Sequence, residues 1–226
     1  MGSGIKSRSG QDAMSVVIVD YGSGNLRSAA KAFERQAATL DRAPSISVSG
    51  DPRDVLAAER LVLPGVGAFG DCAAGLKAVP GLWDAVREFV EQKARPFLGI
   101  CVGMQLMAGK GLEHGEHDGF GWIEGVIDRI VPSDKALKIP HMGWNVLHTE
   151  TPHPVFQGLE KGAHAYFVHS FAFRDVEPEH RLADVDYGGM VVAAVGRDNM
   201  VGTQFHPEKS QHTGLTLIRN FLTWSP

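Results

Sequence analysis

The sequence has few cysteines, no long apolar run and no excess of positive charge. Only 2 cysteines occur in 226 residues, which is too few for a disulfide framework and favours a reducing, cytoplasmic location. No apolar stretch approaches the ~20 residues that a membrane helix needs, so we expect no membrane partner. The formal net charge of −4 offers no basic surface to a nucleic acid.

What remains is sufficient for a folded domain. The chain is 43% hydrophobic and 21% charged, and its length suits one α/β domain. Residues 1–13, MGSGIKSRSGQDA, lack the apolar core of a signal peptide and resemble a vector-derived extension. We therefore expect the domain to comprise residues 14–226 and to begin at Met14.

In the first half of the chain, short apolar runs alternate with helical patterns. Asn25 is the predicted N-cap of a first helix whose apolar positions recur at helical spacing, and Asp51 with Pro52 is a second predicted helix start. A third helical pattern covers residues 82–90. The runs 15–21, 59–65 and 96–101 are predicted as strands, and 45–49 as a weaker strand. This alternation is typical of βαβ units and a parallel sheet.

The second half of the chain is richer in strands. Strand-like runs cover 121–131, 144–150, 165–173 and 188–206, and the turn 196–199 can close a hairpin. A stripe of Leu215, Ile218, Phe221 and Leu222 predicts a C-terminal helix. The predicted fold is α/β, with an open, mostly parallel central sheet, flanking helices and added antiparallel strands.

Two polar loops resemble ligand sites only weakly. In YGSGN, Gly22 and Gly24 suit a dinucleotide-binding loop, but Arg27 stands at the third glycine position, so we interpret the loop as a tight turn. In GLEHGEHDG, His114 and His117 lie beside three carboxylates, at a spacing that suits metal ligands only loosely. We interpret this loop as exposed and polar, and expect neither a metal nor a cofactor.

The stretch GICVGMQ places Cys101 where an apolar strand turns into a helical pattern. A strand, G-x-C-x-G and a helix have the layout of a nucleophile elbow. The helix would point its N-terminus at the thiol, which favours the reactive thiolate, and the N–H of Val102 would supply half of an oxyanion hole. From this stretch alone, a buried structural cysteine is equally consistent.

The stretch TQFHPEKS supplies the partners that such a nucleophile needs. A general base requires a third group that fixes its tautomer, and Glu208 follows His206 by two residues. Together with Cys101 these residues predict a Cys–His–Glu triad. Cys72 lies in the small-residue segment DCAAGLKAV, and we interpret it as packing.

With these motifs the chain, from Met14 onward, resembles the class I (triad-type) glutamine amidotransferases, which carry GICVGMQ-like and HPE motifs. The segments DYGSGNLRS, LPGVGAFGD, PHMGWN and YFVHSF resemble one subfamily, the glutaminase subunits of imidazole glycerol phosphate synthase in histidine biosynthesis. Two residues depart from the usual pattern, because Val102 replaces leucine and Phe171 replaces tyrosine. Both positions act through the backbone, so activity is still expected.

The resemblance implies a residue-by-residue mechanism. Cys101 would attack the carboxamide of L-glutamine, His206 would carry the proton, and Glu208 would orient the imidazole. The resemblance implies substrate contacts at Gly67, Gln105, His169, Ser170 and Phe171. It implies an oxyanion hole at Val102 and at the loop of Gly65, Val66 and Gly67.

The resemblance also implies a partner. Ammonia would pass to a separate cyclase subunit, a (β/α)₈ barrel that forms a heterodimer with this chain and makes imidazole glycerol phosphate and aminoimidazole carboxamide ribotide. The loop from Gly22 to Asn25, together with Trp144 and Tyr166, would face that barrel. The isolated chain is expected to be slow until the partner completes the oxyanion hole.

Three alternatives stay open at this point. The chain could be the glutaminase subunit of another synthase, such as those making pyridoxal phosphate, anthranilate or carbamoyl phosphate. It could be a stand-alone γ-glutamyl cysteine hydrolase that is active without a partner. It could also be a non-enzymatic scaffold subunit, although intact Cys101, His206 and Glu208 argue against a dead site.

Overall fold

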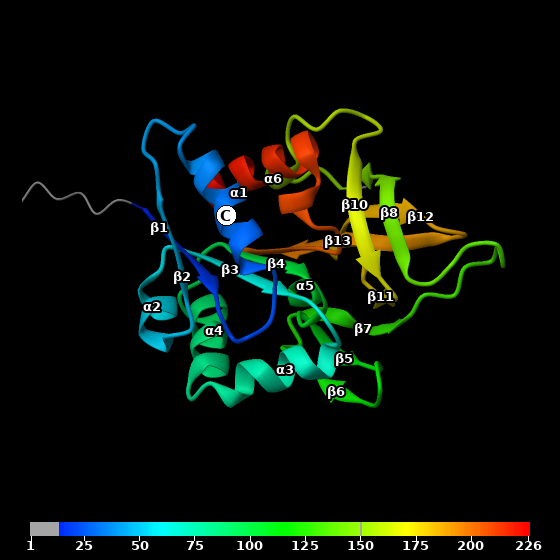
Figure 1. The fold of residues 1–226 in the computed structure, drawn as a ribbon, viewed down its shortest axis with the longest axis horizontal. Helices are drawn as coiled ribbons and strands as arrows, with labels where there is room; N and C mark the ends of the chain where they lie inside the picture. The colour runs from blue at the N-terminus through cyan, green and yellow to red at the C-terminus, as the bar shows by residue number, and fades with distance from the viewer. Residues whose placement is uncertain (1–13, 150) are drawn as a thin grey trace, which may run out of the picture.

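A computed structural model describes residues 14–149 and 151–226. The predicted leader, residues 1–13, and Glu150 lie outside the described residues. The main sheet has eight strands in the order β2-β1-β3-β4-β14-β13-β12-β9 (Figure 1). The strands are β1 (Ser15–Val19), β2 (Ser45–Ser49), β3 (Arg60–Gly65), β4 (Phe97–Cys101), β9 (His148–Thr149), β12 (Arg181–Asp186), β13 (Met190–Arg197) and β14 (Met200–Thr203).

The main sheet is parallel from β2 to β14 and antiparallel from β14 to β9. Strands β1, β3 and β4 are almost wholly buried, as expected for β-branched and leucine-rich runs covered on both faces. The β13–β14 turn contains Asp198 at φ 50°, which confirms the predicted hairpin.

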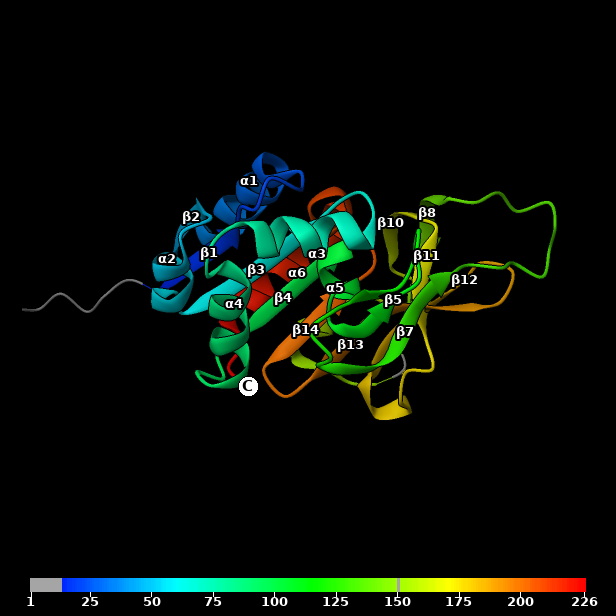
Figure 2. The same ribbon diagram turned by 90° about the horizontal axis from the view of Figure 1, so that it is seen from below.

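Helices cover both faces of the main sheet. Figure 1 shows α1 and α6 on one face and α3 and α4 on the other, and Figure 2 shows α3 and α4 from the side of their face, with α6 behind the sheet. The helices are α1 (Leu26–Ala37), α2 (Pro52–Ala57), α3 (Phe69–Ala78), α4 (Leu82–Glu91), α5 (Val102–Gln105) and α6 (Gln211–Thr223). Three short 3₁₀ turns are η1 (Pro154–Phe156), η2 (Pro178–His180) and η3 (Pro207–Lys209).

Two smaller sheets complete the fold at one end of the main sheet (Figures 1 and 2). One has the order β11-β7-β5-β6 and the other pairs β8 with β10. Their strands are β5 (Ala108–Gly111), β6 (His117–Asp118), β7 (Ile123–Arg129), β8 (His141–Val146), β10 (His164–His169) and β11 (Phe171–Arg174). Phe120 is stacked between Trp83 of α4 and Trp122, with ring centroids 3.9 and 4.1 Å apart. These stacked rings connect the segment before β7 of the four-stranded sheet to α4.

The predicted α/β fold is confirmed, and Asn25 and Asp51 are the N-cap residues of α1 and α2 as predicted. Asp51 caps α2 by accepting the Arg53 N–H at 2.8 Å, whereas the Asn25 side chain makes no capping bond to the described backbone of α1. The helix after Cys101 ends after four residues, because Met107 leads directly into β5. A helix of one turn gives little dipole at the thiol. Within 14–149 and 151–226, no helix is long and apolar enough to cross a bilayer.

Candidate active site

The carboxyl ends of three parallel strands bring the predicted catalytic residues together. Gly65 of β3 pairs directly with Cys101 of β4. On the other side, Thr203 of β14 pairs with Ile100, so Gln204 follows at the level of Cys101 and His206 two residues later. The register of the sheet therefore joins segments that lie about a hundred residues apart in the chain.

Cys101 occupies the strained turn that the glycine pattern predicts. Its φ is 55° and its ψ is −111°, a conformation that costs a residue with a side chain of order 1–3 kcal/mol. A Cβ atom on Gly103 would collide with the carbonyl oxygen of Leu63, and one on Gly99 would lie 2.6 Å from the carbonyl oxygen of Gly103. The two flanking glycines thus allow the backbone to pack closely enough to form the turn.

His206 is oriented by Glu208. The Nδ1–H of His206 donates to Oε1 of Glu208 at 2.9 Å, and each side chain is only 3% exposed. This bond leaves Nε2 of His206 for Cys101. Burial lowers the pKa of His206, but its hydrogen bonds to Cys101 and Glu208 outweigh burial and raise the pKa to about 9. At neutral pH His206 is therefore an imidazolium, protonated on both ring nitrogens.

These residues open onto a pocket of about 480 Å³. Its walls include most of the residues expected to bind substrate or the oxyanion, which are Val66, Gly67, Cys101, Val102, Gln105, His169, Ser170, Phe171 and His206. Gly65 does not line the pocket but lies beside Cys101 in the sheet. The predicted substrate contacts thus gather around the nucleophile.

Sequence reasoning missed Glu113, which also lines this pocket together with His114 and Pro140. The Glu113 carboxylate accepts the backbone N–H of Phe69 at 2.9 Å, which fixes it at the wall. The loop GLEHGEHDG attracted attention only as a weak metal motif. In the structure, His117 lies instead close to Gly70, and no group of three metal-ligating side chains occurs among the described residues.

The Val66 peptide is held from outside the pocket. The Ser23 hydroxyl donates to the carbonyl oxygen of Val66 at 2.8 Å and accepts the Val66 N–H at 3.4 Å. The Cys72 thiol, which the sequence indicated as packing, is buried and donates to the same carbonyl oxygen at 3.4 Å. In this state the Val66 N–H is directed to Ser23, so it is not free to bind an oxyanion.

A chain of side-chain hydrogen bonds lies behind the pocket. Gln105 Nε2 donates to the carbonyl oxygen of Phe171 and to Oε1 of Gln204, each at 3.0 Å, and Gln204 Nε2 donates to the Cys101 sulfur at 3.7 Å. Sequence reasoning missed Gln204. The side chain of His169 contacts the same Phe171 carbonyl at 2.9 Å, and its other nitrogen lies 3.0 Å from His141.

Both of these histidines are held neutral. Burial lowers the pKa of His141 to about 4 and that of His169 to about 3. Because a carbonyl can only accept, His169 Nδ1 carries its hydrogen, and His141 Nδ1 therefore donates to His169 Nε2. The pair stiffens the strand that presents His169, Ser170 and Phe171 to the pocket.

The residues expected at a partner interface lie on the surface. Trp144 of β8 is 47% exposed, and its ring meets that of Tyr166 of β10 edge to face at a centroid distance of 6.0 Å. Asn25 is also exposed, at the start of α1. Because η3 contacts both α1 and β10, these residues flank the segment that carries Glu208.

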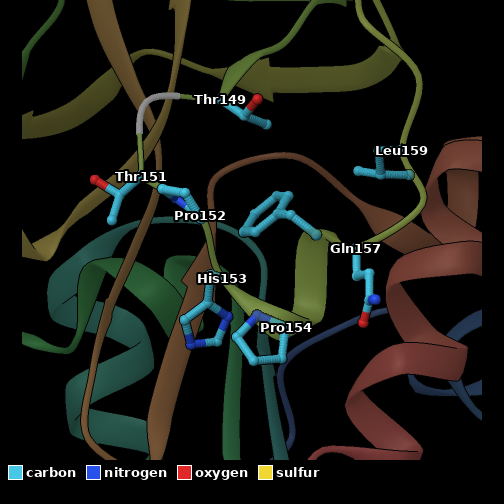
Figure 3. A pocket seen from close by; sticks show the side chains of 8 residues that line it. Thr149, Thr151, Pro152, His153, Pro154, Gln157 and Leu159 are labelled. Carbon is cyan, nitrogen blue, oxygen red and sulfur yellow. The ribbon is translucent and has the colours of Figure 1, made fainter.

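A second pocket of similar volume, about 480 Å³, is lined by a different set of residues (Figure 3). It is lined by residues 149, 151–154, 156, 157 and 159, which include His153 and Pro154. Among the described lining residues there is no cysteine and no carboxylate, and none of them belongs to the predicted site. The catalytic chemistry is therefore assigned to the pocket at Cys101.

Comparison with known proteins identifies the family. The family model for class-I glutamine amidotransferases matches residues 17–224. The imidazole glycerol phosphate synthase subunit HisH of Cereibacter sphaeroides is 59% identical over 213 residues, 94% of this chain and 100% of that protein. The subunit of the same name from Rhodospirillum rubrum is 56% identical over 214 residues, with the same coverage.

Two solved structures share the fold at low sequence identity. A glutamine amidotransferase has a TM-score of 0.67 at 21% identity, covering 92% of this chain and 97% of its own. A glutamine amidotransferase from Thermotoga maritima has a TM-score of 0.56 at 16% identity, covering 94% and 84%. The chain belongs to the class-I glutamine amidotransferases and, within them, to the family of imidazole glycerol phosphate synthase HisH subunits.

Proposed function

We propose that this chain is the glutaminase subunit of imidazole glycerol phosphate synthase, which hydrolyses L-glutamine to glutamate and ammonia. The observation that carries the proposal is that Cys101 and His206 line one pocket together with Val66 and Gly67, while Glu208 holds His206 by a hydrogen bond. The relatives that match 94% of this chain at 56–59% identity bear the name of this synthase subunit. No cofactor is required for this reaction.

In the first step, the sulfur of Cys101 attacks the carboxamide carbon of glutamine. A C–S bond forms, and the carbonyl electron pair moves onto oxygen. The oxyanion is stabilised by the N–H of Val102 and by a backbone N–H of the Gly65–Gly67 loop. When the tetrahedral intermediate collapses, the C–N bond breaks and the His206 imidazolium gives its proton to the leaving nitrogen, which departs as ammonia.

In the second step, water hydrolyses the glutamyl thioester. His206, now neutral, takes a proton from the water as its oxygen attacks the thioester carbon. The C–S bond then breaks with its electron pair on sulfur, glutamate is released, and the thiolate–imidazolium pair is restored. Glu208 holds the imidazole in the same tautomer throughout, since its carboxylate accepts from Nδ1 at 2.9 Å.

Substrate recognition follows from the polar groups of the pocket wall. Glutamine carries an α-ammonium group, and Glu113 is a carboxylate fixed at that wall. Gln105 uses both hydrogens of its amide on Phe171 and Gln204, so its Oε1 is the atom that accepts from the substrate. We assign the remaining contacts to Gly67 and to the backbone of 169–171.

A glutaminase needs a partner that consumes its ammonia, since free ammonia in neutral water becomes unreactive ammonium. We propose a separate cyclase subunit with a (β/α)₈ barrel, bound as a heterodimer at the face that carries Asn25, Trp144 and Tyr166. Its docking would displace the Ser23 contact and free the Val66 peptide to complete the oxyanion hole. The two free cysteines fit the cytoplasmic location that we propose.

The proposal is tested in the complex with the cyclase subunit. Cys101→Ala is expected to abolish glutamine-dependent synthesis while ammonia-dependent synthesis continues, because ammonia added from solution bypasses the thiol. Cys72→Ala is the matched control, since it removes the other thiol and should retain glutamine-dependent synthesis. Glutaminase activity that persists in Cys101→Ala would remove Cys101 from the mechanism.

The same preparations separate the alternatives. A stand-alone γ-glutamyl hydrolase would be as active alone as in the complex. The glutaminase of a different synthase would not bind this cyclase, and a scaffold subunit would not react with a glutamine-like electrophile at Cys101.

A further inference from the structure

Gln204 is a buried polar side chain that the triad chemistry does not use. It is 0% exposed and follows β14 at the level of Cys101. We propose that Gln204 is a further catalytic residue, whose amide N–H donates to the Cys101 sulfur and stabilises the thiolate. This inference rests on the proposed glutaminase function, because it gives Gln204 a part only when Cys101 is the nucleophile.

The hydrogen-bond chain fixes which end of the Gln204 amide faces the sulfur. The carbonyl of Phe171 is backbone and can only accept, so Gln105 must direct its Nε2 toward it. The same Nε2 reaches Gln204 at 3.0 Å, so Gln204 must present Oε1 to Gln105. Nε2 of Gln204 is then the atom 3.7 Å from the sulfur. The assignment of Oε1 and Nε2 in Gln204 thus follows from the backbone carbonyl of Phe171.

The surrounding structure holds this chain in place. The backbone N–H of Gln204 donates to the carbonyl oxygen of Ala193 at 2.9 Å, which fixes the residue against β13. At the other end, His169 contacts the Phe171 carbonyl, and His141 supports His169. A donor with so little freedom needs no reorganisation when charge develops on the sulfur.

The sulfur carries negative charge twice in each turnover. It does so when the thiol proton has passed to His206 before attack, and again when the C–S bond of the thioester breaks and the electron pair returns to sulfur. His206 neutralises the charge from one side. Gln204 adds a neutral donor from the neighbouring strand, and it takes up no proton in either step.

The test compares Gln204→Met, which has a similar size and no donor, with Gln204→Glu. A glutamate keeps an acceptor for Gln105 but places a carboxylate beside the sulfur. Each variant is prepared in complex with the cyclase subunit, and the rate of Cys101 alkylation by iodoacetamide is followed by mass spectrometry across pH. Gln36→Met is the matched control, because Gln36 is also buried but lies in α1 outside the pocket.

The expected result is a shift of the alkylation curve toward higher pH, by about one unit in Gln204→Met and by more in Gln204→Glu. One unit corresponds to about 1.4 kcal/mol, the lower end for a hydrogen bond to a charged group. The other titratable groups around the sulfur and in the pocket wall are unchanged in both variants, namely His206, Glu208, His169, Tyr21, Cys72, Glu113 and His114. A purely structural role for Gln204 would lower activity without moving this curve.

Three outcomes overturn or support the inference. Curves for both variants that coincide with the wild-type curve overturn it, as does a shift of equal size in Gln36→Met. A shift in the expected order, with ammonia-dependent synthesis retained, supports it and shows that the variants fold and bind the partner. Failure of the proposed function is recognised separately, because wild-type complex would then show no glutamine hydrolysis at all.

Discussion

Replacing Ser23 with alanine should activate the isolated chain. One hydroxyl holds both backbone polar groups of Val66, which belong to the peptide units on either side of this residue: it donates to the carbonyl oxygen at 2.8 Å and accepts the N–H at 3.4 Å. We propose that this bonded state is the resting state and that the oxyanion hole forms when one of these peptide units turns. Glycines at 65 and 67 flank Val66, so the peptide can turn with little steric cost.

The size of the effect follows from the shorter of the two bonds. A hydrogen bond at a partly exposed site contributes about 1 kcal/mol net, and its loss should raise the population of the turned peptide about fivefold. The longer bond at 3.4 Å adds little, and the Cys72 contact to the same carbonyl remains. We therefore expect glutamine hydrolysis by isolated Ser23→Ala to be about five times faster than that by the wild-type chain.

The assay is glutamate release by the isolated chain, compared with the rate in the acceptor-bound complex. Ser47→Ala is the control, because Ser47 is an exposed serine of β2, away from the pocket. The increase in the rate of glutamine hydrolysis should vanish in the complex, where the partner has already displaced Ser23. If Ser23→Ala is folded but hydrolyses glutamine no faster than wild type, the Ser23 bonds do not restrain the site.

Three further predictions concern stability and partner binding. The free energy of unfolding should peak near pH 6.5. The stabilisation from His206, whose pKa is raised to about 9, is present below about pH 6.5 and is lost as the pH rises through about 9. The stabilisation from neutral His141 and His169, whose pKa values are lowered, is lost as the pH falls from about 6.5 toward 4. Urea titrations from pH 4 to pH 9 test this, and a flat profile would contradict it. Gly103→Ala should cost about 3 kcal/mol in the same titration, because its Cβ would collide with a backbone carbonyl that cannot move aside, and Gly109→Ala, where a Cβ has room, should cost far less. Trp144→Ala should weaken cyclase binding by about 2 kcal/mol, roughly 30-fold in Kd by calorimetry, and an unchanged Kd would exclude Trp144 from the interface.

The sequence predicts the sheet well because its parallel strands carry their own signal. The runs at β1, β3 and β4 are apolar and bounded by turn residues, and the structure buries them on both faces. The helix predicted after Cys101 is present but only one turn long, because Ala108 and its neighbours pair with β7. Tertiary pairing thus sets its length, which the residue pattern alone does not. Asn25 stands at the predicted cap position, where backbone oxygen alone accepts the first helical N–H groups.

Site residues that lie in a motif contiguous in the sequence could be predicted. Site residues that meet only through the pairing register of the strands could not. Cys101, His206 and Glu208 lie in short motifs whose chemistry is evident from the residue types. Gln204 is visible from the sequence only as a polar residue in a strand-like run, because its contact with Cys101 depends on the pairing of β14 with β4. Ser23 likewise meets Val66 only through the neighbouring positions of β1 and β3.

The order of strands in the sheet explains why these parts can act together. β1, β3, β4 and β14 are adjacent and parallel, so their carboxyl ends form one edge. Along that edge the chain presents, in turn, the Ser23 loop, the Val66 peptide, Cys101 and the segment of Gln204 and His206. Each group therefore lies next to the group that it is proposed to affect. The Ser23 loop lies beside the oxyanion hole, the oxyanion hole lies beside the Cys101 nucleophile, and Cys101 lies beside the His206 base. A partner that moves only the outermost loop can then control the thiol from two strands away without touching it.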